Sequence, residues 1–251
     1  MTLWESCGGE ARTGLVQGRL FRLVESQERV ATLGYVDSLE EQALLEELLE
    51  HSKPDYPEYC RADLHYLLAT PFRYPPLPWG SRFGGRHQPG IFYGGCSQRT
   101  TLAEAAFYRF VFWHSIQADP PAAILHSEHT LFTVPYRTER GVRLQQSPFD
   151  AHRQVLRNPA EYAPTQALGR AMRDAGVEAF EYASARDPEG GSCVGLFTPA
   201  PFTRRAPTTL QAWFCELGAE EVAFKPQAGA EVLRFPLELF LVDGQLPRPA
   251  S

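Results

Sequence analysis

Residues 71–90, PFRYPPLPWGSRFGGRHQPG, limit what this chain can fold into more than any other segment. Proline fixes φ and lacks a backbone N–H, and glycine admits turns that other residues avoid, so this run interrupts regular secondary structure. We therefore expect an ordered loop of turns and extended backbone. Loops of this length in compact proteins tend to carry function, so this loop is the first place to look for a site.

Regular elements are predicted before this loop. The segment 15–26 predicts a short strand that carries Arg22 among apolar residues. A capping box at Ser38 and Glu41 begins a helix at 38–50, in which leucines recur at helical spacing. We expect those leucines to serve packing rather than chemistry.

The rest of the chain mixes helices and strands. A short apolar run at 91–93 predicts a strand, and a helix follows from about Thr101 to Trp113. The further expected elements are a helix at 164–175 closed by Gly176, strands at 177–184 and 193–197 around a turn at 187–191, strands near 211–217 and 220–224, and an apolar finish around 232–242. Because no regular β-α-β alternation is present, we expect an α+β fold rather than a doubly wound sheet.

Composition bounds the class of function. With 251 residues and 43% hydrophobic content, the chain can bury one full core, so a single domain is expected. A net charge of −6 argues against direct binding to a nucleic-acid backbone. No apolar stretch reaches the roughly 18 residues of a membrane helix, and the first residues lack the features of a secretion signal. We expect a cytoplasmic protein that does not bind membranes.

Cysteines and histidines form no recognisable site. The five cysteines are scattered and include no C-x-x-C pair. His126 and His129 lie three residues apart, but no further ligand motif accompanies them. We therefore expect neither a metal nor a disulfide. A nucleophile elbow, a Walker loop and a G-x-G-x-x-G motif are also missing, which argues against hydrolase, kinase and dehydrogenase functions.

Three arginines, Arg73, Arg82 and Arg86, lie in the glycine-rich loop. The backbone there can approach a ligand closely, and a guanidinium binds phosphate through two parallel hydrogen bonds, so the loop suits a diphosphate. The same arginines could equally be solvated or paired with acidic neighbours. The residues alone leave both interpretations open.

Tyr93 and Ser184 are further candidates. Tyr93 ends the apolar run after the loop, where its ring could stack on a flat heterocycle, although tyrosines at strand ends are commonly packing residues. Ser184 lies where a strand gives way to a turn and could donate a hydrogen bond to a substrate amide. Arg186 and Asp187 beside it could simply pair with each other.

Glu104 has a local structural explanation. It follows Thr101 at the spacing of a capping box, and a carboxylate is favourable near the positive end of a helix. The local pattern alone therefore favours a structural role for Glu104.

The ordered series PFRYPP, GSRFGGRHQPGIFYGG, TTLAEAAFYRF and EYASARDPEGGSCVGLF resembles the RES domain, named for arginine, glutamate and serine. RES proteins are the toxin half of bacterial RES–Xre toxin–antitoxin pairs. The resemblance covers about 20–202. It implies a split mixed β-sheet flanked by helices, similar to the ADP-ribosyltransferase toxins that clamp NAD⁺. Within one domain over 1–251, it leaves a helical insertion at about 38–70 and a C-terminal strand-rich extension at about 203–251.

The resemblance also assigns site residues. The family's strand arginine, loop arginine, tyrosine, glutamate and serine fall on Arg22, Arg82, Tyr93, Glu104 and Ser184. Arg86 remains an alternative for the loop arginine, because the family's arginine often lies in a Gly-Gly-Arg-aromatic run, although here His87 follows Gly84-Gly85-Arg86. Arg73 and Arg86 are further candidates to bind the ligand. The arginines would hold the diphosphate, Tyr93 would position the nicotinamide ribose, and Ser184 would contact the nicotinamide side. Glu104 would stabilise positive charge on the ribose, a role compatible with capping.

The function implied by the resemblance is cleavage of the nicotinamide–ribose bond of NAD⁺, by an NAD⁺ glycohydrolase or NAD⁺ phosphorylase that needs no metal. The implied partner is an Xre-type helix-turn-helix antitoxin that covers the cleft. One alternative is a mono-ADP-ribosyltransferase that modifies a protein. Another is a noncatalytic nucleotide-binding partner of a DNA-binding antitoxin. The sequence leaves open the acceptor and whether the chain forms a homo-oligomer.

Overall fold

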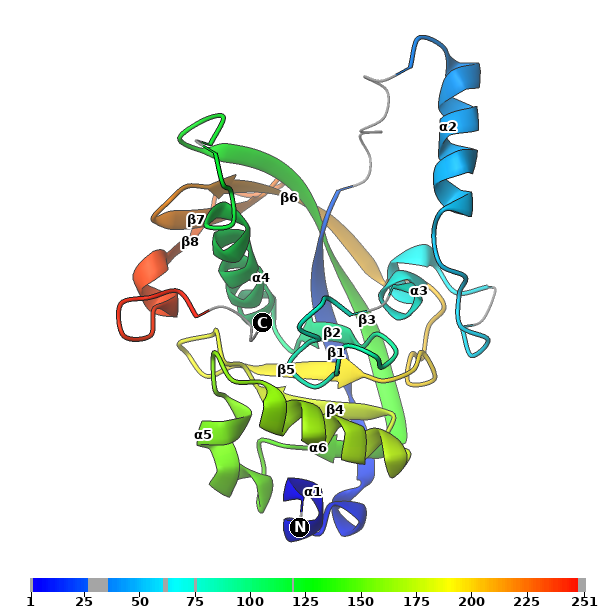
Figure 1. The fold of residues 1–251 in the computed structure, drawn as a ribbon, viewed down its shortest axis with the longest axis vertical. Coiled ribbons are helices and arrows are strands. Elements are labelled where there is room, and N and C mark those ends of the chain that lie inside the picture. The colour runs from blue at the N-terminus through cyan, green and yellow to red at the C-terminus, as the bar shows by residue number, and fades with distance from the viewer. Residues whose placement is uncertain (1, 27–35, 61–62, 75, 119, 248–251) are drawn as a thin grey trace.

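An eight-stranded mixed sheet forms the centre of the molecule (Figure 1). The computed structural model describes residues 2–26, 36–60, 63–74, 76–118 and 120–247. The strand order is β1-β2-β5-β4-β3-β6-β7-β8, and the β3–β4 pair runs parallel whereas the other pairs are antiparallel. The strands are β1 (Gly14–Glu25), β2 (Phe92–Gly95), β3 (Leu125–Arg143), β4 (Ala179–Ala183), β5 (Ser192–Leu196), β6 (Thr209–Leu217), β7 (Glu221–Pro226) and β8 (Leu233–Pro236).

The sheet is split beside β1. This strand pairs with β3 along its whole length, from Gly14 to Glu25, but its register with β2 is the single pair Phe21 and Gly95. The α+β class and the split mixed sheet expected from the sequence are therefore confirmed.

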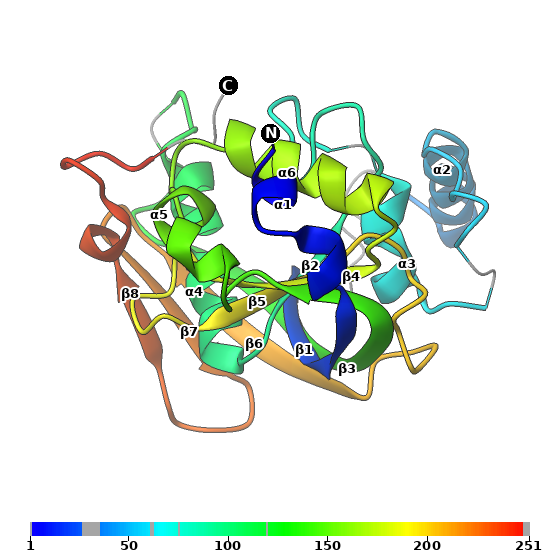
Figure 2. The same cartoon turned by 90° about the horizontal axis from the view of Figure 1, so that it is seen from below.

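Helices cover the sheet on both sides (Figure 2). α4 (Gln98–Trp113) packs against β1, β2, β5, β6 and β7, while α5 (Arg153–Leu156) and α6 (Ala163–Asp174) pack together on the β4 side with α1 (Leu3–Ser6). The remaining helices are α2 (Leu39–His51) and α3 (Tyr66–Arg73), with 3-10 turns at Gly9–Arg12, Phe149–His152 and Leu237–Phe240. None of the described helices has the length and apolar character needed to cross a membrane.

Two buried clusters hold the site-bearing elements in place. Phe107 of α4 and Phe224 of β7 belong to one cluster, and Met172 of α6 and Phe180 of β4 belong to the other. All four side chains are fully buried. Deleting a buried phenylalanine of this kind costs about 3–5 kcal/mol. The two clusters therefore hold α4 and β4 firmly in place.

The longest strand, β3, is not among the predicted elements. It pairs with β1, β4 and β6, and Pro135 lies within it opposite Arg19 of β1. A proline inside a run argues against a central strand, because it cannot donate a ladder hydrogen bond. The Pro135 carbonyl still accepts a hydrogen bond from the Thr203 N–H at 3.2 Å, so the segment between β5 and β6 helps to hold the proline in place.

α2 forms where predicted, but the expectation that its leucines pack is wrong. The Ser38 hydroxyl accepts the Glu41 N–H at 3.1 Å, whereas the Glu41 carboxylate accepts the Asp37 N–H, so the reciprocal half of the capping box is absent. Leu39 is 77% exposed and Leu48 58% exposed. The helix stands away from the body of the molecule (Figure 1), so helical periodicity here does not mark a buried face.

α4 begins earlier than predicted, and this changes the position of Glu104. Ser97 is the N-cap, and its hydroxyl accepts the Thr100 N–H at 3.1 Å. Thr101 therefore lies inside the helix, where its hydroxyl donates to the Ser97 carbonyl at 2.8 Å. Glu104 occupies the second turn, and the predicted capping box between Thr101 and Glu104 is wrong.

The proline- and glycine-rich segment is a loop for most of its length. α3 extends to Arg73 with Pro71 in its last turn, so the loop begins after Arg73 rather than at residue 71. The other predicted elements are present with ends shifted by a few residues: the strands at 15–26, 91–93, 177–184, 193–197, 211–217 and 220–224, and the helix at 164–175 with Gly176 at φ 71° behind it.

Candidate active site

Four of the predicted residues line one cavity of about 290 Å³. They are Arg22, Arg82, Tyr93 and Glu104, which come from β1, the loop after α3, β2 and α4. Residues separated by up to 82 positions in the chain are thus brought together, as the resemblance implies. A larger hollow of about 730 Å³ lies over β6 and β7 and is lined by none of the four.

Ser184 fixes the carboxylate of Glu104. Its hydroxyl lies 2.5 Å from Glu104 Oε1, and its oxygen accepts the backbone N–H groups of Arg186 at 3.1 Å and Asp187 at 3.0 Å. Because those two bonds occupy both lone pairs of the hydroxyl, Ser184 acts as the donor in its contact with Glu104. Ser184 is fully buried and does not line the cavity, so the expected contact with a substrate amide is replaced by a contact with Glu104.

The turn behind Ser184 is tied to the start of α4. The Asp187 carboxylate accepts the Thr100 hydroxyl at 2.8 Å and the Glu189 N–H at 3.0 Å. Arg186 donates to the Pro159 carbonyl at 2.6 Å. The suggested pairing of Arg186 with Asp187 is therefore wrong, and no sequence pattern indicates that the turn and α4 meet.

Arg22 carries a cation that is partly buried. Its Nη1 donates to the Tyr93 carbonyl at 2.5 Å, and its guanidinium carbon lies 4.8 Å from the centre of the Phe92 ring. Nε is shielded from solvent without a hydrogen-bond partner in the described chain, and no described carboxylate forms an ion pair with Arg22. Burial lowers the pKa of Arg22 to about 10. Since buried charges are normally paired, Arg22 is prepared to receive an anion.

Arg82 is held in a similar way on another wall of the cavity. The residue is 7% exposed, and its Nη1 donates to the Asn158 carbonyl at 2.7 Å. Its guanidinium carbon lies 4.8 Å from the centre of the Tyr162 ring. Among the described residues no carboxylate pairs with Arg82, so the cavity combines two unpaired guanidinium groups with one carboxylate.

Tyr93 contributes its ring to the cavity, but its hydroxyl is already engaged. The hydroxyl oxygen lies 2.9 Å from Ser81 Oγ and accepts the Phe83 N–H at 3.1 Å. Burial raises the pKa of Tyr93 to about 12. Tyr93 therefore remains protonated at neutral pH and holds the loop with Arg82 against β2.

Arg73 and Arg86 do not reach this cavity. Arg73 donates from Nη1 to Glu50 at 2.6 Å and from Nε to the Pro54 carbonyl at 2.5 Å, beside the end of α2. Arg86 is exposed on the loop. The geometry thus favours Arg82 over Arg86 as the loop arginine of the site.

The sequence analysis missed several residues of the cavity that carry polar groups. Tyr108, Tyr182 and Cys193 line it with the predicted residues. The Cys193 thiol lies 3.7 Å from Glu104 Oε1, and burial raises the pKa of Cys193 well above its usual value, so the thiol stays neutral. Tyr108 follows Glu104 by four residues, a helical spacing that could have identified it. In the described part of the chain no cluster of three metal-ligating side chains is found.

Comparison with known protein families shows to which family the chain belongs. Residues 58–217, more than half of its length, match the family model of the RES domain. The chain belongs to the RES family. The match includes Arg82, Tyr93, Glu104 and Ser184, whereas Arg22 and α2 precede it.

One solved structure similar to this RES chain is titled as the crystal structure of the M. tuberculosis MbcT–MbcA toxin–antitoxin complex. The alignment has 11% sequence identity and a TM-score of 0.45, and it covers 85% of this chain and 92% of that one. Comparison with curated proteins found no match.

Proposed function

We propose that this RES protein binds NAD⁺ in the cavity and cleaves its nicotinamide–ribose bond. The observation that carries the proposal is the convergence of two unpaired guanidinium groups, Arg22 and Arg82, with one fixed carboxylate, Glu104. A diphosphate supplies the anion that the arginines lack, and a carboxylate suits a sugar that becomes positively charged. Membership of the RES family supports the same reading.

The chemistry assigns a role to each side chain. When the bond between nicotinamide and ribose breaks, positive charge builds on the ribose, and a fixed carboxylate stabilises that state more than the ground state. Ser184 holds Glu104 Oε1, and no described residue bonds Oε2, which leaves this oxygen for the reacting sugar. Nicotinamide departs as a neutral molecule from a cationic pyridinium, so the step needs no general acid. Tyr93 and Tyr182 supply aromatic walls for the ring.

The acceptor of the ADP-ribosyl group is water or inorganic phosphate. Purified protein incubated with NAD⁺ should release nicotinamide, and chromatography of the second product with and without phosphate identifies the acceptor. ADP-ribose indicates hydrolysis, and its phosphorylated form indicates phosphorolysis. Label that accumulates on a protein band from lysate would indicate a mono-ADP-ribosyltransferase. Absence of nicotinamide release under all three conditions contradicts the proposed reaction.

The biological setting we propose is a toxin paired with an Xre-type helix-turn-helix antitoxin that covers the cavity. The RES family is the support for this setting. Expression of the chain with the protein encoded next to it should give a complex that releases no nicotinamide, whereas the chain alone is active. A complex that retains full activity would show that the neighbouring protein does not cover the site.

A further inference from the structure

The cavity around Glu104 is small for a dinucleotide. Its volume of about 290 Å³ lies just below the roughly 300–1,000 Å³ typical of sites that enclose a whole drug-sized ligand. It suits a nicotinamide and its ribose, but not a second nucleoside as well. If the proposed function holds, the adenosine half of NAD⁺ must lie outside this cavity.

A second hollow, of about 700 Å³, adjoins the first at Arg22. We call it the α3 hollow. Arg22 is the residue that lines both spaces. The walls of the α3 hollow come from β1, from α3 and from the end of α2 with the residues that follow it. A ligand that passes Arg22 from one hollow to the other would place its middle section on the guanidinium.

Aromatic rings gather around the α3 hollow. Tyr56, Tyr66 and Tyr74 line it, and each is 40% or more exposed. Tyr66 also stacks on His65, with ring centres 4.7 Å apart and planes 28° from parallel. Groups of exposed aromatic side chains on the surface of a soluble protein often mark a binding site. Rings of this kind bind the flat face of a nucleobase by stacking.

The charges of the α3 hollow favour an anionic ligand. Its lining contains three cations, Arg22, Lys53 and Arg73, and two carboxylates, Glu25 and Glu50, on a chain whose net charge is −6. Glu50 is shared between Lys53 at 2.8 Å and Arg73 at 2.6 Å. Arg22 has no carboxylate partner among the described residues. The site therefore offers one unmatched positive charge next to a set of aromatic rings.

We infer that the α3 hollow binds the adenosine half of a dinucleotide, with the diphosphate on Arg22 and the base against Tyr66 or Tyr74. This inference rests on the proposed function for the choice of ligand. It gives the residues at the end of α2, outside the family match, and those of α3, inside it, a part in substrate selection. It also gives Arg73 a part in the binding of the ligand, because its ion pair with Glu50 fixes one wall of the hollow.

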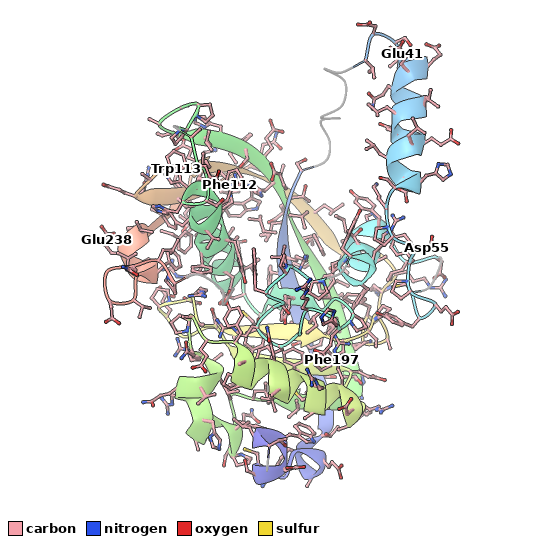
Figure 3. The ribbon with its side chains drawn as sticks, in the orientation of Figure 1. Glu41, Asp55, Phe112, Trp113, Phe197 and Glu238 are labelled. Carbon is pink, nitrogen blue, oxygen red and sulfur yellow. The ribbon has the colours of Figure 1, made fainter. Side chains whose placement is uncertain are left out.

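Titration calorimetry with ADP tests the inference without any need for turnover. ADP carries the adenosine and the diphosphate but no nicotinamide. Tyr66→Ala and Tyr74→Ala remove rings that are 51% and 40% exposed, so both variants should fold. Phe112→Ala on α4 is the matched control, because Phe112 is 50% exposed and lies outside the hollow (Figure 3). We expect one tyrosine variant or both to weaken ADP binding about five- to a hundredfold, while the control binds as the wild type does.

The results separate this inference from the proposed reaction. Wild-type protein that does not bind ADP, or tyrosine variants that bind it as tightly as wild type, would overturn the assignment of the hollow even if NAD⁺ is cleaved. Loss of ADP binding in the tyrosine variants would support the assignment of the α3 hollow as the adenosine site even if NAD⁺ is not cleaved. With cleavage present, nicotinamide mononucleotide adds a kinetic check. The affected variant should raise KM for NAD⁺ and leave kcat/KM for the mononucleotide unchanged.

Discussion

Ser184 donates its hydroxyl proton to Glu104 Oε1 across 2.5 Å, while its oxygen accepts two backbone N–H groups. The turn that provides those groups is fastened to α4 through Thr100 and Asp187. The Glu104 carboxylate is thus held by the buried Ser184 and the turn behind it. A carboxylate held in this way needs no reorganisation when charge develops on a bound sugar.

Replacement of Ser184 by alanine should separate positioning from folding. Ser184→Ala should lower kcat for NAD⁺ cleavage about ten- to a hundredfold, since a misplaced group loses rate without losing substrate affinity. It should also cost about 2 kcal/mol or more of folding free energy, because two buried N–H groups lose their acceptor. Steady-state kinetics and urea denaturation measure the two effects. Thr165→Ala, which deletes another fully buried hydroxyl away from the cavity, should affect stability only. A Ser184→Ala enzyme with normal kcat would show that Ser184 has no positioning role.

Arg22 should matter more for ligand binding than for folding. Its burial holds its pKa at about 10, below the 12.5 of the free side chain, so at neutral pH the charged guanidinium opposes folding, and this cost falls as the pH rises through 10. Because methionine removes this cost, Arg22→Met should leave the free energy of unfolding unchanged or raise it. The same variant should raise KM for NAD⁺ at least about tenfold. Arg86→Met, at the exposed loop arginine, should leave KM unchanged. Equal effects of the two substitutions would contradict the assignment of the site arginines.

The site shows what the sequence can and cannot reveal. Arg82, Tyr93 and Glu104 could be placed together because their order and spacing resemble a family pattern, although local signals favoured a capping role for Glu104. The role of Ser184 could not be read in the same way. Its partner lies 80 residues away, and only the folded backbone places Arg186 and Asp187 so that they saturate its oxygen.

His129 gives a test of the fold that is independent of the site. It is 4% exposed on β3, and burial, with a smaller effect of Arg109, lowers its pKa to about 4. In the unfolded chain this histidine takes up a proton near pH 6.5, whereas in the folded protein it stays neutral down to about pH 4. The folded state is therefore fully stable above pH 6.5 and loses stability as the pH falls from 6.5 towards 4. Between pH 7 and 5 this loss should be about 2 kcal/mol. Chemical denaturation should show it in wild type and in His126→Gln, at an exposed site on the same strand, but not in His129→Gln. A loss that persists in His129→Gln must come from other groups.

The leucines of α2 should contribute little to stability. Leu44 is 56% exposed and Leu48 58% exposed, so Leu44→Gln with Leu48→Gln should shift the melting temperature by no more than about 2 °C. Leu68→Ala in α3, at a fully buried position, should lower it several times further, because it leaves a cavity. Thermal melting followed by circular dichroism compares the two. A large loss of stability in the α2 variant would mean that those leucines are buried in solution.

The general fold was easier to predict than its details, for physical reasons. Alternation and turn residues located β4, β5, β6 and β7, because each of these strands is short and bounded by glycine or proline. β3 escaped because Pro135 interrupts its pattern and because neighbouring strands, rather than its own residues, fix it as a strand. α2 shows the opposite error, since Leu39, Leu48 and Leu49 recur at helical spacing and yet are exposed.

The most direct test of the account is the initial rate of nicotinamide release from NAD⁺ by Glu104→Gln. Glutamine keeps the size of the side chain and an oxygen that can accept the Ser184 hydrogen bond, so the substitution removes charge with little change of shape. We predict a rate at least about a hundredfold below that of wild type, with KM little changed. A Glu104→Gln protein that releases nicotinamide as fast as wild type would contradict the central claim, because the reaction would then not depend on the carboxylate at the centre of the cavity.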